Sequence, residues 1–215
     1  AAFSKDPHLV EAYQKNQDIH AKTAAHIFDC PLNAVEPHQR SIGKTINFGV
    51  IYGQSAFGLA KQLGVPNHEA KRFIDGFYQE FEGVRVFKEK VLSQARELGF
   101  VTTYLGRRRN LPDINSSNGL SRQNAERMAF NAVFQGSAAD MIKKAMITID
   151  RELFERKLKT KMIMQVHDEL VFEVPHKEVD EVKGLVVRIM EGAFDVGVPI
   201  KVSCSVGKNW AEAHA

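Results

Sequence analysis

The chain has 215 residues, of which 44% are hydrophobic and 26% charged, which is ordinary for a globular protein with a core. No run of about 18 apolar residues and no signal-peptide pattern is present, and Cys30 and Cys204 form no disulfide framework, so we expect a soluble, intracellular protein without a membrane partner. The net charge of +3 does not establish a polyanionic partner, although residues 1–150 hold 19 Lys and Arg against 15 Asp and Glu, and residues 151–215 hold 10 against 11.

The first half of the chain predicts a series of helices. They are expected at residues 6–15, 18–28, 36–52, 56–63, 67–81 and 84–98, with Asn67 as an N-cap and Gly99 as the residue that closes the last one. We therefore expect the first half of the chain to form a helical body.

The helix expected over residues 36–52 carries an unusual column of side chains. Arg40, Lys44, Phe48 and Tyr52 follow at steps of four, and each such step turns only about 40° around a helix axis. The apolar face for burial is supplied separately by Ile42, Ile46, Val50 and Ile51. The column is therefore available to a ligand that is anionic at one end and flat at the other.

A small hairpin is expected over residues 100–112, where β-branched residues flank a glycine turn. It contains three consecutive arginines, Arg107 to Arg109, and such a run can neutralise phosphates. A solvated basic turn is the alternative, and charge alone favours it.

Two further helices are expected at 121–133 and 137–158, separated at Gln135-Gly136. Arg127, Asn131 and Gln135 again follow at steps of four and form a column of donors. Acceptors occur in the minor groove of every base pair, so such a column can contact a duplex without reading its sequence. A polar, solvated helix face is the alternative, while Met128 and Phe130 with three nearby alanines are expected in the core.

The last part of the chain changes character. Residues 161–166 and 169–174 are expected as two buried strands joined by a tight turn, followed by a helix at 176–194 and a strand at 200–205. The pattern predicts an α+β fold.

Two adjacent acids, Asp168 and Glu169, are expected at the tip of this hairpin. Adjacent carboxylates repel each other unless a cation is bound, and a hard divalent ion such as Mg²⁺ takes oxygen ligands of this kind. A solvent-exposed acidic turn is the alternative. His167 beside Asp168 does not indicate a hydrolase, because no nucleophile signature accompanies the pair.

Four stretches together resemble family A DNA polymerases over essentially the whole chain. They are "DIHAKTAA" (18–25), "RSIGKTINFGVIYG" (40–53), "NAERMAFNAVFQGSAAD" (124–140) and "QVHDELVFE" (165–173). The resemblance implies a helical fingers subdomain at residues 1–118 and the C-terminal part of an antiparallel-sheet palm at residues 119–215. It also implies a DNA-directed nucleotidyltransferase that acts in DNA replication and repair, in a bacterial cytoplasm and associated with the nucleoid.

The resemblance assigns roles to individual residues. It implies that His20, Arg40, Lys44, Phe48 and Tyr52 bind the incoming dNTP, and that Arg127, Asn131, Gln135 and His167 contact primer-template DNA. Asp168 would be a catalytic metal ligand, with Glu169 in a supporting catalytic role, and the intact enzyme would use two Mg²⁺ ions.

The sequence departs from the family pattern after Arg40, where the family has a second Arg and then Ala residues. Here Ser41, Ile42 and Gly43 follow, and Gly43 is expected to cost the helix up to roughly 1 kcal/mol relative to Ala.

The resemblance also places the family's first palm motif, which carries another catalytic Asp, before Ala1. We therefore expect a fragment that lacks this motif, the thumb and any exonuclease domain and is inactive by itself. A noncatalytic nucleic-acid-binding module derived from the same fold is the alternative.

Overall fold

The computed structural model describes residues 1–214, and the chain divides into two compact units. The first contains residues 1–134 with 196–198, and the second contains 135–195 with the residues from 199 on. The division falls inside one long helix, α7, between Phe134 and Gln135. The fold is α+β, as predicted.

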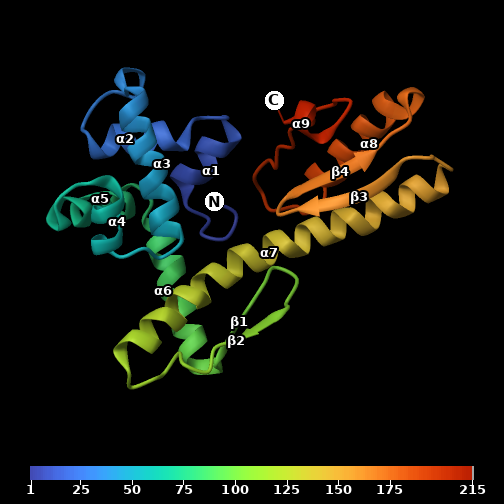
Figure 1. The fold of residues 1–215 in the computed structure, drawn as a ribbon. Coiled ribbons are helices and arrows are strands. Elements are labelled where there is room, and N and C mark those ends of the chain that lie inside the picture. The colour runs from blue at the N-terminus through green and yellow to red at the C-terminus, as the bar shows by residue number, and fades with distance from the viewer. Residues whose placement is uncertain (215) are drawn as a thin grey trace. The chain divides into compact units, whose positions relative to one another are not determined.

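The first unit consists of helices and one small hairpin (Figure 1). Its elements are α1 Pro7–Gln14, α2 Ile19–Ile27, a 3₁₀ turn Leu32–Ala34, α3 Pro37–Ile51, α4 Ala56–Leu63, α5 Asn67–Glu80, α6 Glu82–Leu98, β1 Phe100–Thr102, β2 Arg108–Asn110 and the first part of α7 Gly119–Glu155. Strands β1 and β2 are antiparallel, with Val101 opposite Arg109.

Side-chain caps and left-handed glycines mark several helix ends in this unit. The Asp6 carboxylate accepts from Leu9 N at 2.9 Å at the start of α1, and the Ser55 hydroxyl caps α4. Gly64 and Gly99 end α4 and α6 with φ of 69° and 74°, a conformation that costs glycine little. These residues fix four of the helix ends in this unit.

Aromatic side chains fill the core of the first unit. Phe73, Phe77 and Phe81 follow one face of α5 and its end, and Phe130 of α7 packs edge to face on Phe134 at 4.9 Å. Burying each such side chain contributes about 1.5–3 kcal/mol. This core holds the surrounding helices in fixed positions.

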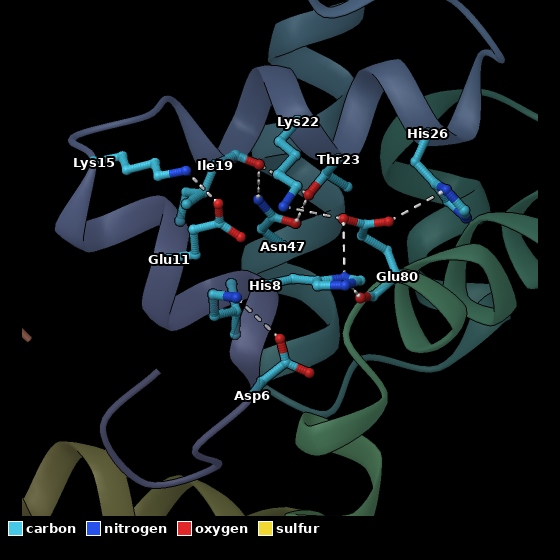
Figure 2. A network of polar contacts seen from close by, with 11 residues as sticks. Asp6, His8, Glu11, Lys15, Ile19, Lys22, Thr23, His26, Asn47 and Glu80 are labelled. Atoms are coloured by element: carbon cyan, nitrogen blue, oxygen red, sulfur yellow. Dashed lines mark hydrogen bonds and ion pairs between the residues drawn. The ribbon is translucent and has the colours of Figure 1, made fainter.

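A half-buried carboxylate at the end of α5 joins it to α1 and α2. Glu80 lies 3.3 Å from Lys22 Nζ and 3.5 Å from the Nδ1 atoms of both His8 and His26 (Figure 2). These contacts link α1, α2 and α5. They therefore help to fix the position of α2 and of the side chains that it presents.

The second unit packs a hairpin and a helix against the later part of α7 (Figure 1). Its other elements are β3 Lys161–Val166, β4 Glu169–Glu173, a 3₁₀ turn His176–Glu178, α8 Val179–Glu191 and α9 Trp210–Ala213. Ile149 of α7 and Leu185 of α8 are buried in a second core, and Phe172 of β4 packs against it. The buried Glu178 carboxylate accepts from the N–H groups of Lys159 and Thr160, which fixes the start of β3.

Several predicted helix boundaries differ in the structure. Residues 121–158 do not form two helices, because α7 continues through Gln135-Gly136; one glycine inside a helix costs only about 1 kcal/mol, and packing on both sides outweighs it. Pro66, not Asn67, is the N-cap of α5, since its extended backbone leaves its carbonyl to accept from Ala70 N. The helix expected at 176–194 begins as a 3₁₀ turn and ends at Glu191.

The strand expected at 200–205 does not form within the described residues. Val202 N donates instead to the Glu191 carboxylate at 3.1 Å, so its backbone is satisfied by a side chain and not by a neighbouring strand.

Two predictions of burial are also wrong. Strand β3 is largely exposed, with Ile163 and Met164 on the surface, and the apolar residues of β4 are only partly buried, because only one face of this two-stranded sheet packs on helices. Met128 is 44% exposed, whereas its neighbours Ala129 and Phe130 are buried.

Candidate functional site

The predicted column lies on the surface of α3. Arg40 and Lys44 are exposed, and Phe48 and Tyr52 are each 46% exposed. The rings of Phe48 and Tyr52 are nearly parallel, at 9°, with centroids 6.2 Å apart. Ile46 and Val50 are buried, as predicted, so one helix packs on the core and still presents the column to a ligand.

A glycine allows α2 to lie directly against α3. A side chain at Gly43 would overlap the carbonyl oxygen of His20 and would come within 3.1 Å of Ala24 N. The departure from the family pattern at Gly43 therefore has a structural reason. Glycine lowers the helix propensity of α3 at this position, but only a residue without a side chain lets the two helices pack this closely.

This packing brings His20 beside the column. The imidazole lies 5.7 Å from the Phe48 ring, and its Nδ1 is 2.9 Å from the Asn47 amide nitrogen. Burial is the largest effect on the pKa of His20 and lowers it; Asp18 opposes this, while Arg40 and Lys44 lower it further. His20 is therefore a neutral donor near pH 7.

Arg40 is anchored to the start of α2. Its Nε donates to Asp18 Oδ2 at 2.6 Å, and Asp18 Oδ1 accepts from the backbone N–H groups of His20 and Ala21. Burial would raise the pKa of Asp18, but the bonds from Arg40 and the backbone outweigh it and lower that pKa. One carboxylate thus fixes both Arg40 and the turn that carries His20.

A cavity of about 590 Å³ opens along the other side of the column. It is lined by Ser41, Lys44, Thr45, Phe48, Gly49, Tyr52, Gln54, Gln62 and Arg127. Gln54 is held by a 3.0 Å bond to Gln62, and a side chain at Gly49 would collide with it. The cavity therefore combines one aromatic wall with two cations and two amides.

The α7 column contacts this region through its first two members. Arg127 packs against Gly53, whose φ is 69°, and Asn131 Nδ2 donates to the Tyr52 carbonyl at 3.3 Å. Among residues 1–214, Asn131 Oδ1 is buried and has no hydrogen-bond partner. Gln135 is exposed on the same helix, in the second unit.

The acidic pair occupies the β3–β4 turn. His167 and Asp168 form the turn itself, with His167 at φ 54°, and Glu169 is already the first residue of β4, opposite Val166. The expectation that both acids form the tip is therefore wrong for Glu169, which is paired in β4 at the residue where the sequence predicts the strand to begin. Asp168 and Glu169 are both exposed.

A histidine that follows α9 contacts Glu169. His214 Nε2 lies 2.9 Å from Glu169 Oε2, and His214 Nδ1 lies 3.0 Å from the Trp210 carbonyl. The bond to Glu169 is the main reason that the pKa of His214 is raised. No sequence pattern indicates this pair, because the two residues are 45 positions apart.

The turn offers only part of a metal site. Carboxylate oxygens are suitable donors for a hard divalent ion. In the described part of the chain, however, no three His, Cys, Asp or Glu side chains are grouped so that they could hold a metal. Asp168 and Glu169 therefore fit such an ion as a partial ligand set.

The arginine run lies on the predicted hairpin. Arg108 and Arg109 belong to β2 and are exposed, and the Arg108 guanidinium lies 4.6 Å from the centre of the Phe100 ring.

Among the helices of residues 1–214, none has the length and apolar content that a bilayer-spanning segment needs.

Comparison with known proteins identifies the family. The model of DNA polymerase family A matches residues 1–212, so the chain belongs to this family. DNA polymerase I of Pseudomonas aeruginosa is 47% identical over 214 residues, and that of Bacillus caldotenax is 44% identical over 213. The POL domain of Pol1 from M. smegmatis, in complex with DNA primer-template and dNTP, is 42% identical with a TM-score of 0.95.

The chain is much shorter than these relatives. It is covered completely by the P. aeruginosa protein and to 99% by the B. caldotenax protein, yet it spans only 23% and 24% of their lengths. All of it matches the M. smegmatis chain, of which it spans 38%.

Proposed function

We propose that this chain is the nucleotide-binding part and a portion of the palm of a template-directed DNA polymerase, a nucleotidyltransferase that acts in DNA replication and repair. The observation that carries the proposal is the site on α3, where two cations, a neutral histidine donor and two stacked rings come from two helices packed against each other. The M. smegmatis POL domain, which was solved with primer-template and dNTP bound, supports it.

The residues of α2 and α3 have distinct tasks in this proposal. Arg40 supplies a planar fork and Lys44 a point charge for the triphosphate, and His20 adds a neutral donor. Phe48 provides a flat surface for the sugar and base, and Tyr52 borders the template base. The ion pair with Asp18 restrains Arg40 before nucleotide arrives, which reduces the entropy that binding must overcome.

DNA is the second partner. Arg127, Asn131 and Gln135 follow one face of α7, and in the proposal their donors contact minor-groove acceptors. His167, in the left-handed turn before Asp168, is assigned to the primer end.

The acidic turn is assigned to catalysis. Asp168 would hold metal and Glu169 would support the site, and two Mg²⁺ ions, when bound, lower the pKa of the primer hydroxyl and stabilise charge on the reacting phosphate. Because residues 1–214 supply only a partial ligand set, we propose that another carboxylate comes from outside these residues.

The remaining assignments follow the family. Residues 1–118 are proposed as fingers and residues 119–215 as palm, with the remaining domains supplied by further polymerase sequence. The enzyme would then act on nucleoid DNA in a bacterial cytoplasm. The noncatalytic alternative explains duplex binding, but it gives no reason for Arg40, Lys44 and His20 to converge.

The α3 site can be tested by removing one cation. We expect Lys44→Ala to weaken dNTP binding roughly tenfold, since a charge-assisted contact is lost, and to leave duplex affinity unchanged. The matched control is Lys71→Ala, the same charge loss on the exposed face of α5. Equal loss of nucleotide and duplex affinity would indicate a general phosphate patch and contradict the proposal.

A further inference from the structure

A buried amide lies between α2 and α3, directly behind His20. Asn47 is only 7% exposed and follows Gly43 by one helical turn, on the side of α3 that contacts α2. Polar side chains buried this deeply are hydrogen-bonded in native proteins, and the bonds they make are specific in direction. Asn47 is not among the proposed contacts to nucleotide, DNA or metal.

Three groups contact the Asn47 amide, and the Ile19 carbonyl determines which way it points. Its Nδ2 lies 3.3 Å from the Ile19 carbonyl and 2.9 Å from His20 Nδ1, and its Oδ1 lies 2.7 Å from the Thr23 hydroxyl. Figure 2 shows the amide between Ile19 and Thr23. A carbonyl can only accept, so turning the amide over would place Oδ1 against the oxygen of Ile19. The two Nδ2 hydrogens therefore have two acceptors, the Ile19 carbonyl and His20 Nδ1.

This orientation decides where the imidazole proton sits. A ring nitrogen that accepts a hydrogen bond carries no proton, so the neutral ring must carry its proton on Nε2. Gly43 adds to the constraint, because its missing side chain lets the His20 backbone lie against α3. The ring is thus fixed in position and in tautomer from the buried side of the helix.

We propose that Asn47 is a positioning residue that holds His20 as the Nε2–H tautomer, so that its free N–H donates to an oxygen of the bound triphosphate. The donor role rests on the proposed function of His20 as a triphosphate contact. The control of the tautomer is independent of that function, because it is set by contacts within α2 and α3.

The test is NMR on the 215-residue chain, with the His20 ring signals assigned by comparison with His20→Gln. Long-range ¹H–¹⁵N patterns distinguish a ring with its proton on Nε2 from one with its proton on Nδ1. We expect the unsubstituted chain to show the Nε2–H form at pH 7.5. A ring with its proton mainly on Nδ1, or an even mixture, would overturn the inference without any variant.

Two substitutions sharpen the test. In Asn47→Asp a carboxylate oxygen can only accept, so we expect the proton to move to Nδ1 or the ring to become charged, and affinity for inorganic tripolyphosphate to change. Asn47→Ala should release the tautomer and lower that affinity roughly tenfold. Thr23→Val is the matched control: it removes a buried hydroxyl from the same cluster but leaves Nδ2 facing Ile19 and His20, so the Nε2–H form should persist.

The two halves of the proposal fail differently. A tautomer unchanged in Asn47→Asp and Asn47→Ala would overturn the positioning role. If the tautomer responds as expected but tripolyphosphate leaves the His20 signals unmoved, the donor role fails, and with it the assignment of His20 to the triphosphate.

Discussion

The two candidate sites differ in how much of each is built by this chain. On α3, Arg40 is tied to Asp18, His20 is held by Asn47, and Phe48 stacks on Tyr52, so each of these groups has a neighbour that restrains it. At the β3–β4 turn, Asp168 is exposed, and the Glu169 carboxylate is held by a surface contact with His214. The first site is preorganised, whereas the second is a partial site.

In the proposed function, the two sites would have different tasks, nucleotide binding on α3 and catalysis at the β3–β4 turn. Nucleotide binding needs cations and a flat surface at fixed spacing, and one helix with a neighbour can supply them. Holding metal ions against a phosphate needs carboxylates from different elements, and one hairpin cannot supply them. The structure therefore predicts that binding and catalysis can be separated.

A substitution at the acidic turn should have the strongest consequence. In a polymerase-length chain that contains these residues, Asp168→Asn should lower the rate of primer extension at least about a hundredfold, because charge stabilisation at the reacting phosphate is lost. Dissociation constants for dNTP should change little. Glu173→Gln, at the other end of β4, is the control and should extend primers normally; similar rates for both variants would contradict the assignment.

The next effect concerns the packing that builds the α3 site. Gly43→Ala should destabilise the chain by about 1–3 kcal/mol, because the new methyl group must displace the His20 carbonyl. Gly184→Ala in α8 is the matched control: no atom lies within 4 Å of the added carbon, so it should stabilise by about 0.5–1 kcal/mol. Urea unfolding measures both, and a Gly43→Ala variant as stable as the parent would show that α2 and α3 are not tightly packed.

A smaller effect is expected for duplex contact. Gln135→Ala in the same polymerase-length chain should slow extension severalfold and leave dNTP affinity normal, since one hydrogen bond to DNA is lost. Gln123→Ala, an exposed glutamine earlier on α7, is the control. If single-turnover rates do not distinguish the two variants, the α7 column is only a solvated face.

The weakest effect is a pH dependence in the second unit. The folded pKa of His214 lies above its unfolded value of 6.5, so the contact with Glu169 is fully present below pH 6.5 and is lost as pH rises through the folded pKa. Trp210, whose ring lies 4.9 Å from His214, should report this by fluorescence, with a midpoint above 6.5. Glu169→Gln should bring the midpoint back toward 6.5, whereas Glu173→Gln should not; a midpoint that ignores Glu169 would exclude the pair.

The sequence predicts those parts of the molecule that depend on local spacing. The column on α3 was predictable because steps of four residues share a helix face, and the β3–β4 turn was predictable from two short apolar runs. The continuity of α7 through Gly136 was not, because tertiary packing outweighs the local preference of one glycine. The prediction of a strand at 200–205 was wrong for a related reason. A strand needs a neighbouring strand to pair with, and the local sequence does not show whether one is present.

The supporting residues of the site were harder to predict. Asp18 contacts Arg40, which is 22 residues away, and Asn47 contacts His20, which is 27 residues away. No short sequence pattern predicts contacts between residues this far apart. One signal was available: a helix whose buried side contains Asn next to Ile46 and Val50 carries a polar group that needs a specific partner. The exposure of β3 depends on which elements pack beside it, and the local sequence of the strand does not predict this.

Primer extension by the chain alone decides whether binding and catalysis are separate. The purified 215-residue chain, with primer-template, Mg²⁺ and all four dNTPs, is compared with a polymerase-length chain that contains the same residues, after nucleotide binding by both has been verified. We expect both to bind dNTP and only the longer chain to extend the primer. Template-dependent extension by the 215-residue chain, abolished by Asp168→Ala, would contradict the separation.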